Sequence, residues 1–410
     1  MWRLEKIIPY ARNARKIPQA AIDKVAASIK EFGWRQPIVV DREGIVICGH
    51  TRLLASRQLG LREAPVHVAD NLTPAQVRAY RLLDNRSHQE TSWDEDLLGL
   101  ELLDLKGMGV DLDLTGFNLD EIDTFLAKAE GTTGLIDDDA APALEETAVS
   151  VPGDCWLLGK AHRVLCGDST QMKNLERVLD GSLADMVFCD PPFNVNYLGG
   201  PDRHGRSRRP IANDNLGLGF EQFLYDACRH MLEVTKGALY ICMSSSEIDT
   251  LKRAFTGAGG HWSTFVIWAK NTFTLGRSDF QRQYEPILYG WKEGADHFWC
   301  GARDQGDVWF IDKPRVNDLH PTQKPIALVE RAIRNSSKGR DIVLDGFGGS
   351  GSTLIACEKS GRQTRVIELD PKYVDCTVRR WQTWTGKTAT LEGDGRTFDE
   401  VAAERLQATA

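Results

Sequence analysis

An apolar run with strand character, Met186–Cys189, ends in the tetrapeptide Asp190, Pro191, Pro192 and Phe193. Two consecutive prolines stop a strand and restrict the backbone around them. The Asp190 carboxylate and the backbone carbonyl of Pro191 can both accept hydrogen bonds from an exocyclic amino group. The ring of Phe193 offers a face on which a planar base can stack. The tetrapeptide can therefore orient an amino nitrogen for a transfer reaction, and the alternative is a Pro-Pro turn with a structural role alone.

A second segment has the pattern of a nucleoside site. The strand Asp341–Asp345 runs into the loop Gly346–Gly351, which a predicted helix over 352–359 and a strand over 363–367 follow. Glycines allow a ligand to approach the backbone, and the helix N-terminus presents free N–H groups. A carboxylate after the second strand can accept hydrogen bonds from both ribose hydroxyls. The loop is no Walker A motif, because no Gly-Lys-Ser/Thr follows; a tight turn without a ligand is the alternative. The predicted cofactor-binding residues here are Asp345, Phe347, Gly348, Gly349, Ser350, Gly351 and Glu368.

Both segments resemble motifs of the amino-group DNA methyltransferases. The loop from Phe347 to Gly351 is similar to their Phe-x-Gly-Ser-Gly cofactor loop, and Asp-Pro-Pro-Phe is similar to their catalytic motif. Asp168, in Leu165–Ser169, matches the family's Gly-Asp pair. Lys324, in His320–Pro325, matches its His-Pro-Thr-x-Lys-Pro. The catalytic motif precedes the cofactor loop, and this order resembles the beta group of the family.

The resemblance implies S-adenosylmethionine as the cofactor, with Asp168 near its adenine and the segment of Lys324 over its methionine part. It also implies methyl transfer to N6 of an adenine flipped out of double-stranded DNA. Asp at the first motif position is typical of adenine enzymes and Ser of cytosine-N4 enzymes, so cytosine-N4 methylation stays open, as does an RNA substrate. Such a transfer needs no metal.

Two related chemistries do not fit the motif. Carbon-5 cytosine methylation requires a Pro-Cys nucleophile, which the sequence lacks, and Cys189 is predicted to be a buried strand residue. Methyltransferases that modify glutamine in proteins carry Asn before Pro-Pro, where this chain has Asp190.

Basic residues cluster in the region between the two main motifs. Such side chains could contact DNA phosphates near a flipped base, and a solvated loop is the alternative. The predicted DNA-binding residues are Arg203, Arg206, Arg208 and Arg209, with His204 among them, and Arg277 and Arg282.

A third candidate site lies near the N-terminus, where Gly49, His50 and Arg52 follow a strand and open a helix. Backbone N–H groups and an arginine at such a position can hold a phosphate. The run resembles the nucleotide-binding domain of ParB-like proteins, although those usually carry Glu at the position of His50, and no helix-turn-helix is evident. A nucleotide is therefore a candidate ligand, and a scaffold that positions DNA or a partner is the alternative. A nucleotide-gated DNA-binding protein with a vestigial methylase half is the competing function.

The pattern of elements predicts an α/β fold: a Rossmann-like methyltransferase sheet, preceded by a small α+β ParB-like domain and a helical segment. We expect a ParB-like domain over 1–72, a helical extension over 73–130, an acidic linker over 131–150, the methyltransferase domain over 151–395 and a tail over 396–410. The predicted strands of the methyltransferase sheet are Met186–Cys189, Ala238–Met243, Thr264–Trp268, Pro286–Tyr289, Ile342–Leu344 and Thr364–Glu368.

The composition is that of a water-soluble protein. Residues 90–150 hold 17 acidic and two basic side chains, a net of −15, which leaves +7 for the rest of a chain whose net charge is −8. A basic body is compatible with phosphate binding. Nine cysteines without a Cys-x-x-Cys pair indicate reduced thiols.

The expected location is the cytoplasm. No apolar run approaches the roughly 18 residues of a membrane span, and the N-terminus lacks the apolar core of a signal peptide. The fusion resembles methylases of phages and mobile elements, which indicates a bacterial or phage-infected host. A partnering restriction nuclease and a homodimer stay open.

Overall fold

The computed structural model divides the chain into two units, Met1–Ala129 and Glu130–Ala410. It describes residues 1–87, 90–131, 133–195, 213–274, 279–301, 303–313 and 323–407. Within these ranges, no helix is both long and apolar enough to cross a membrane. Each unit has its own hydrophobic core.

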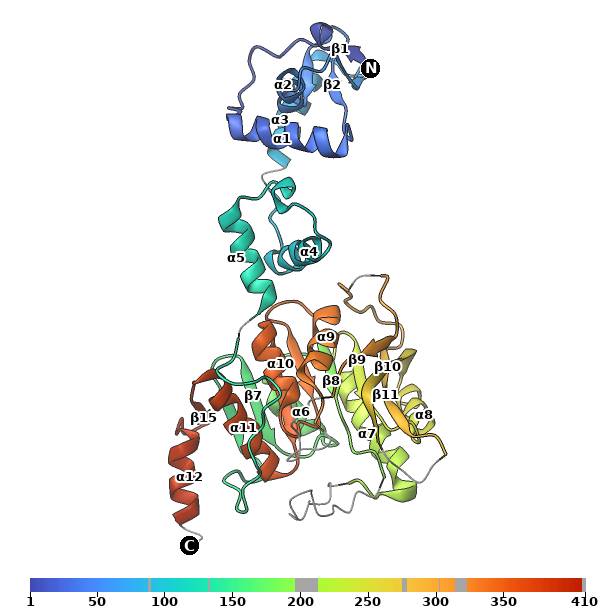
Figure 1. Ribbon diagram of the computed structural model, residues 1–410, viewed down its shortest axis with the longest axis vertical. Coiled ribbons are helices and arrows are strands. Elements are labelled where there is room, and N and C mark those ends of the chain that lie inside the picture. Colours follow the sequence, from blue (N-terminus) through green and yellow to red (C-terminus); the bar gives the residue numbers. More distant parts are fainter. Residues whose placement is uncertain are drawn as a thin grey trace. The chain divides into compact units, whose positions relative to one another are not determined.

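The first unit begins with a small α+β fold. Strands β2, β3 and β5 form a sheet in the order β3-β2-β5, and β1 pairs with β4. Ile38, Val40 and Val46 point into its core with Leu53 of α2, as the predicted strand-turn-strand-helix pattern requires. The elements are β1 Trp2–Arg3, α1 Gln19–Phe32, β2 Ile38–Val40, β3 Val46–Cys48, α2 His50–Gln58, β4 Glu63–Ala64, β5 Val66–Val68 and α3 Pro74–Ser87 (Figure 1).

A pair of helices completes the first unit. Helix α4 spans Glu95–Gly107 and α5 spans Leu119–Glu130, and Leu102, Ile122 and Leu126 form their shared core. Asn118 and Glu121 form a reciprocal capping box in which each backbone N–H donates to the other's side chain at 2.8 Å. One acidic residue of this region, Glu121, therefore caps a helix.

The second unit contains a ten-stranded sheet in the order β12-β10-β11-β9-β8-β13-β14-β7-β6-β15. The five central strands, from β9 to β7, are parallel. β11 is antiparallel to β9, and β6 is antiparallel to β7. The strands are β6 Cys155–Leu158, β7 His162–Cys166, β8 Met186–Cys189, β9 Leu239–Cys242, β10 Gly260–Thr274, β11 Arg282–Lys292, β12 Val308–Phe310, β13 Ile342–Asp345, β14 Gln363–Glu368 and β15 Ala389–Leu391.

Helices cover both faces of this sheet (Figure 1). Helices α6 to α8 bury their apolar side chains in one core, and α9 to α12 bury theirs in another. The predicted α/β class is confirmed. The helices are α6 Met172–Leu179, α7 Phe220–Glu233, α8 Ile248–Gly257, α9 Ile326–Ser336, α10 Ser352–Ser360, α11 Pro371–Thr385 and α12 Phe398–Gln407.

The neighbouring strands β8 and β13 mark a topological switch point. From β13 the chain passes through α10 to β14 on one side, and from β8 it passes through α7 to β9 on the other. α10 and α7 pack on opposite faces of the sheet. The carboxyl ends of such strands form a crevice in which α/β proteins bind ligands.

The segment predicted to be an acidic linker is packed against the second unit. Asp138 accepts from the Trp384 indole at 3.0 Å and pairs with Lys359 at 2.9 Å. The Asp375 carboxylate accepts from the backbone N–H groups of Val149 and Ser150 at 2.6 and 2.9 Å. Sequence composition indicated a flexible linker because Gly, Asp and Pro show no periodicity, but these polar groups bind to helices far along the chain. We call residues 133–150 the strap.

Candidate active site

Asp190 lies at the carboxyl end of β8, next to β13, and so at the switch point. Its Oδ2 accepts a hydrogen bond from Lys324 Nζ at 2.7 Å, while its Oδ1 is buried and has no hydrogen-bond donor among the residues that the structure describes. Burial raises the pKa of Asp190, and the adjacent Lys324 ammonium opposes that shift. The free Oδ1 is an acceptor that a ligand amino group could satisfy.

The rest of the tetrapeptide is held by contacts that the sequence did not indicate. The backbone N–H of Phe193 donates to Asp214 Oδ1 at 2.9 Å. Asn194, which has a left-handed backbone (φ 55°), accepts from the N–H groups of Leu216 and Gly217 at 3.0 and 3.1 Å. Pro191 is buried, and Pro192 and Phe193 are partly exposed. The Phe193 ring thus stays accessible beside Asp190.

Lys324 is a buried cation, with 4% of its side chain exposed. Besides Asp190 it faces Glu285 Oε2 at 3.2 Å, and its ammonium lies 5.0 Å from the centre of the Phe193 ring. Ser352 at the start of α10 donates to the Lys324 carbonyl at 2.8 Å. The structure therefore places Lys324 against the tetrapeptide predicted to be catalytic, whereas the motif match in the sequence predicted that Lys324 binds the cofactor.

The glycine loop follows β13 and begins with a buried carboxylate. Asp345 is 4% exposed, and its Oδ1 accepts from the Phe347 N–H at 2.9 Å. Burial raises the pKa of Asp345 to about 7. The Phe347 ring packs on Phe223 of α7, 5.8 Å between centres. Phe347 thus anchors the loop to a helix.

Glycine is required at two positions of the loop by close approach. A Cβ at Gly348 would lie 2.3 Å from Val366 of β14, and one at Gly351 would lie 2.9 Å from Thr377. Gly351 also has φ +82° and precedes the first residue of α10. The buried Ser350 lies between them. The loop backbone is therefore pressed against β14 and α11, and its open side faces the carboxyl edge of the sheet.

Glu368 and Asp168 lie at the ends of neighbouring strands. Glu368 ends β14, and its two oxygens accept from the N–H groups of Gly349 and Asp370, each at 2.8 Å. Asp168 follows β7, and its carboxylate accepts from Thr170 and Gln171. A carboxylate oxygen has two lone pairs, so Glu368 retains acceptor capacity for a ligand. Burial raises the pKa of Glu368.

Two residues of α11 support the loop and were missed by sequence reasoning. Thr377 Oγ1 donates to the Gly349 carbonyl at 2.9 Å. Arg380 is fully buried and donates to the carbonyls of Ser350 at 3.0 Å and of Asp138 in the strap at 2.8 Å. Burial lowers the pKa of Arg380 to about 10, so it stays cationic at neutral pH. Neither residue lies in a motif, and only the packing of α11 on the loop identifies them.

The sequence did not indicate Glu285 and Lys270, two further charged residues near Lys324. Glu285 Oε1 pairs with Lys270 Nζ at 2.6 Å, and its Oε2 faces Lys324. They come from β11 and β10, and neither residue lies in one of the motifs matched in the sequence. Two lysines beside Glu285 lower its pKa even though burial acts in the opposite direction.

Of the predicted DNA-binding residues the structure describes one, Arg282. It is exposed at the start of β11 and donates to Ser244, just after β9, at 3.3 Å. Because β11 is antiparallel to β9, this position lies at the same sheet edge as Asp190. The other predicted DNA-binding residues lie outside the described residues; they are Arg203, Arg206, Arg208, Arg209 and Arg277, together with the neighbouring His204.

The third predicted site is in the first unit. Gly49 has φ +102° and precedes α2, and a Cβ there would lie 3.1 Å from the Arg52 guanidinium. Arg52 Nη1 donates to Gln36, while its Nε is buried without a partner. His50 Nε2 accepts from the Tyr10 N–H at 3.3 Å, and burial lowers its pKa. The structure thus brings Gly49 and Arg52 together at a helix N-terminus.

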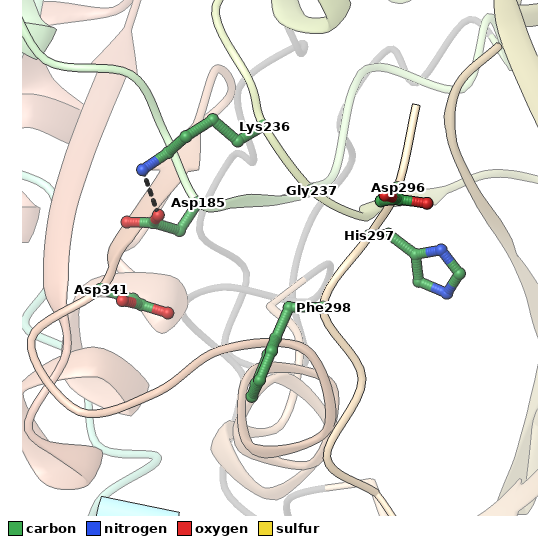
Figure 2. Close-up of a pocket in the computed structure, with 7 residues that line it drawn as sticks. All are labelled: Asp185, Lys236, Gly237, Asp296, His297, Phe298 and Asp341. Carbon is green, nitrogen blue, oxygen red and sulfur yellow. Dashed lines mark ion pairs between the residues drawn. The ribbon is translucent and has the colours of Figure 1, made fainter. Parts of the chain in front are cut away.

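A pocket of about 310 Å³ lies elsewhere, at the amino ends of the strands. Its lining includes Asp185, which precedes β8, and Asp341, which precedes β13. Figure 2 shows the Lys236 ammonium directed at the Asp185 carboxylate, and the two lie 2.6 Å apart. None of the predicted site residues lines it. The pocket is therefore separate from the candidate active site.

Models of known protein families match three parts of the chain. Residues 184–379 match a DNA methylase model of the N6/N4 type, and residues 3–86 match the ParB N-terminal domain. Residues 96–152 match the ParB-methyltransferase HTH domain, so a helix-turn-helix that was not evident in the sequence is present by this criterion. That match crosses the predicted boundary between the helical extension and the linker.

Individual relatives agree with these matches. The chain is 26% identical over 260 residues to DNA adenine methyltransferase YhdJ of Escherichia coli K12, covering 54% of this chain and 83% of that protein. It is 27% identical over 246 residues to type II methyltransferase M.HpaI of Haemophilus parainfluenzae, and this match covers 53% of this chain and 73% of M.HpaI. The M1.HpyAVI–SAM complex is a similar solved structure, with a TM-score of 0.42 and 21% identity. The match covers 53% of this chain and 98% of the M1.HpyAVI chain. Residues 184–379 thus form a DNA methylase domain of the N6/N4 type, which follows a ParB N-terminal domain and a ParB-methyltransferase HTH domain in the chain.

Proposed function

We propose that this chain transfers the methyl group of S-adenosylmethionine to N6 of an adenine flipped out of double-stranded DNA. The observation that carries the proposal is the position of Asp190. Its carboxylate is at the switch point of the sheet, beside the glycine loop, and its Oδ1 is buried without a donor. An unsatisfied buried carboxylate oxygen is costly, and an amino group of a bound base would satisfy it.

The chain's own residues can prepare an amino nitrogen for attack. The lone pair of an adenine amino group is delocalised into the ring. A hydrogen bond from that group to Asp190 Oδ1 favours a tetrahedral nitrogen, whose lone pair is then available. Stacking on Phe193 would hold the flipped base and offset part of the cost of extrusion. Asp190 can also take the proton that the nitrogen must lose once it carries the methyl group.

The glycine loop fits the adenosylmethionine cofactor. S-adenosylmethionine supplies an electrophilic methyl group on a sulfonium. Gly348 and Gly351 let the loop pack tightly, and Glu368 at the end of β14 has spare acceptor capacity for ribose hydroxyls. Asp168 at the end of β7 would lie near the adenine moiety. M1.HpyAVI, a structural relative, was solved with SAM.

Adenine is the proposed base for two reasons. Asp rather than Ser stands first in the catalytic tetrapeptide, and one relative is by its name a DNA adenine methyltransferase. Cytosine-N4 methylation is the second candidate, because the matching family model covers N6 and N4 methylases alike. Both amino groups would use Asp190 in the same way.

The test is incubation of the full chain with unmethylated plasmid DNA and labelled S-adenosylmethionine, followed by nucleoside analysis. We expect the label in N6-methyladenine. Label in N4-methylcytosine would support the proposed site and mechanism and would show that the target base is cytosine instead of adenine. Absence of label from DNA, in a chain that binds the cofactor, would contradict the proposed function.

We further propose that the first unit holds a nucleotide phosphate near Gly49 and Arg52. Support comes from the left-handed Gly49 at the start of α2 and from the buried Arg52 Nε, which lacks a partner. A helix N-terminus with an adjacent guanidinium is suited to a phosphate group. A solved relative of this domain, with a TM-score of 0.27, is a ParB from Caulobacter crescentus complexed with CTP-gamma-S.

A further inference from the structure

Four side chains of alternating charge form a row that ends at Asp190. Lys270 Nζ lies 2.6 Å from Glu285 Oε1, Glu285 Oε2 lies 3.2 Å from Lys324 Nζ, and Lys324 Nζ lies 2.7 Å from Asp190 Oδ2. Their side chains are 10%, 19%, 4% and 26% exposed, in that order. The four residues come from four separate places in the sequence, so only the fold assembles this row.

The sheet order explains how Glu285 and Lys270 reach the site. Ile287 of β11 pairs with Cys242 at the end of β9, so Glu285 lies just beyond the carboxyl edge of the parallel strands. β10 is antiparallel to β11, and its residue Trp268 pairs with Glu285. Lys270 is therefore carried to the same edge, which is the edge that holds Asp190.

The charges of the row balance one another. A single lysine between two carboxylates would leave a net negative charge in a buried place, which is unfavourable. Lys270 supplies the second positive charge and makes the row neutral. Glu285 in turn gives the Lys324 ammonium an anion on the side away from Asp190. Lys324 is thus held between two carboxylates instead of turning fully toward one.

The consequence concerns which oxygen of Asp190 is free. With Glu285 in place, Lys324 engages Asp190 at Oδ2 and leaves Oδ1 without a donor. Without the Glu285 anion, Asp190 would be the one carboxylate of the described part of the chain that faces the Lys324 ammonium, which could then cover both of its oxygens. The acceptor needed for the amino group of a base would then be lost.

We propose that Glu285 is a positioning residue for methyl transfer: with Lys270 it holds Lys324 at Asp190 Oδ2, so that Oδ1 stays open to the amino group of the target base. This inference rests on the proposed function. Glu285 acts through Lys324 and need not touch the base itself.

The first experiment compares single-turnover methyl transfer to DNA by the wild-type chain and by Glu285→Gln across pH. The substitution keeps the shape of the side chain and removes its charge. We expect the rate at the pH plateau to fall roughly tenfold or more, with unchanged affinity for S-adenosylmethionine. Glu285→Asp, which keeps the charge, should recover part of the rate.

The pH profile separates a positioning role from a merely structural one. Within the described ranges, the charged groups around Asp190 are Lys324, Glu285, Lys270 and Asp345. Glu285 raises the pKa of Asp190 and Lys270 lowers it. The acidic limb of the rate profile should therefore move to lower pH in Glu285→Gln and to higher pH in Lys270→Met.

The matched control is Glu293→Gln. Glu293 follows the same strand, is 70% exposed and pairs with His261 at 3.3 Å; its substitution should leave the rate and the profile unchanged. The inference would be overturned if Glu285→Gln had the rate and the acidic limb of the wild type. It would also be overturned if the acidic limbs of Glu285→Gln and Lys270→Met moved in the same direction. If Glu285→Gln does not fold, Lys270→Met is the test: a shift of its acidic limb to higher pH would support the inference, and any other result would overturn it. A wild-type chain that methylates no DNA would instead remove the proposed function itself, and this inference with it.

Discussion

Asp190 carries the charge on which the proposed reaction depends, and its neighbours decide how that charge is used. Lys324 engages one oxygen, and the other is buried and open. Burial raises the pKa of Asp190, which makes its anion a stronger hydrogen-bond acceptor, while the Lys324 ammonium acts in the opposite direction. Two opposing influences on one carboxyl group are typical of a functional site.

Replacing the carboxylate should separate catalysis from cofactor binding. We expect Asp190→Ala to abolish methylation of DNA and to leave the affinity for S-adenosylmethionine within about threefold of the wild-type value. The reason is that the glycine loop follows β13 and packs on β14 and α11, so its conformation does not depend on Asp190. Labelled methyl transfer and cofactor titration measure the two properties. Asp249→Ala, at a carboxylate of α8 that is 81% exposed, is the control. Wild-type activity in Asp190→Ala would refute the mechanism.

Asp345 should make stability depend on pH. Its pKa is raised by burial from 3.8 to about 7. Between these values the folded chain holds a proton that the unfolded chain has released, so this group's contribution to stability falls as pH rises through that window. We expect Asp345→Asn to gain stability relative to the wild type between pH ~4 and ~7. Urea unfolding at several pH values measures this; a stability difference that does not change with pH would contradict it.

At the scale of elements, the strap joins parts of the methylase unit that are distant in sequence. Asp139 Oδ1 accepts from the N–H of Ile326, the first residue of α9, at 2.9 Å, and its carbonyl accepts from Gln323 at 2.9 Å. The strap therefore supplies the N-terminal cap that α9 lacks within its own sequence. Lys324 lies between these two contacts.

Removing that cap should weaken the unit and displace Lys324. We expect Asp139→Ala to cost ~1 kcal/mol in the free energy of unfolding, which is typical of a lost helix cap. Methyl transfer should also slow, because Gln323 and Ile326 flank Lys324. Urea denaturation and the DNA methylation assay measure these effects. Glu145→Ala, at an exposed position of the same strap, is the control and should change neither quantity.

At the scale of the whole molecule, the chain combines two units with separate cores and different candidate ligands. Unit Met1–Ala129 contains the Gly49–Arg52 site, and unit Glu130–Ala410 contains Asp190 and the glycine loop. The ParB N-terminal match, 3–86, lies within the first unit and the methylase match, 184–379, within the second, whereas the HTH match, 96–152, includes residues of both.

A nucleotide should bind the first unit independently of methylation. We expect CTP or ATP to bind the full chain, and we expect Arg52→Ala to weaken that binding at least roughly tenfold, as loss of a charged phosphate contact does. Methylation of DNA in the absence of nucleotide should be unaffected. Equilibrium binding of a fluorescent nucleotide measures the first effect, with Arg57→Ala, exposed on α2, as the control. Equal affinity in Arg52→Ala would remove this residue from the site.

The sequence by itself determined the parts of the protein whose signal is local. Asp190 with its two prolines, the glycine loop and Glu368 could be predicted because each is a short run at a strand end, and the resemblance to known motifs indicated a chemistry for it. The α/β class and the ParB-like domain followed from periodicity and resemblance in the same way. Cys189 is buried in β8 as predicted.

Only the tertiary structure decided how distant residues meet. Glu285 and Lys270 join Asp190 because β11 pairs antiparallel with β9 and β10 pairs antiparallel with β11, and nothing in their own sequence indicates that order. The strap has the composition of a linker, yet Asp139 caps a helix almost 200 residues later in the chain, with a separation of 187. Arg380 likewise clamps the loop from a helix without a motif. Local patterns specify strands, turns and caps, whereas ion pairs and caps between remote segments depend on the packing of the whole sheet.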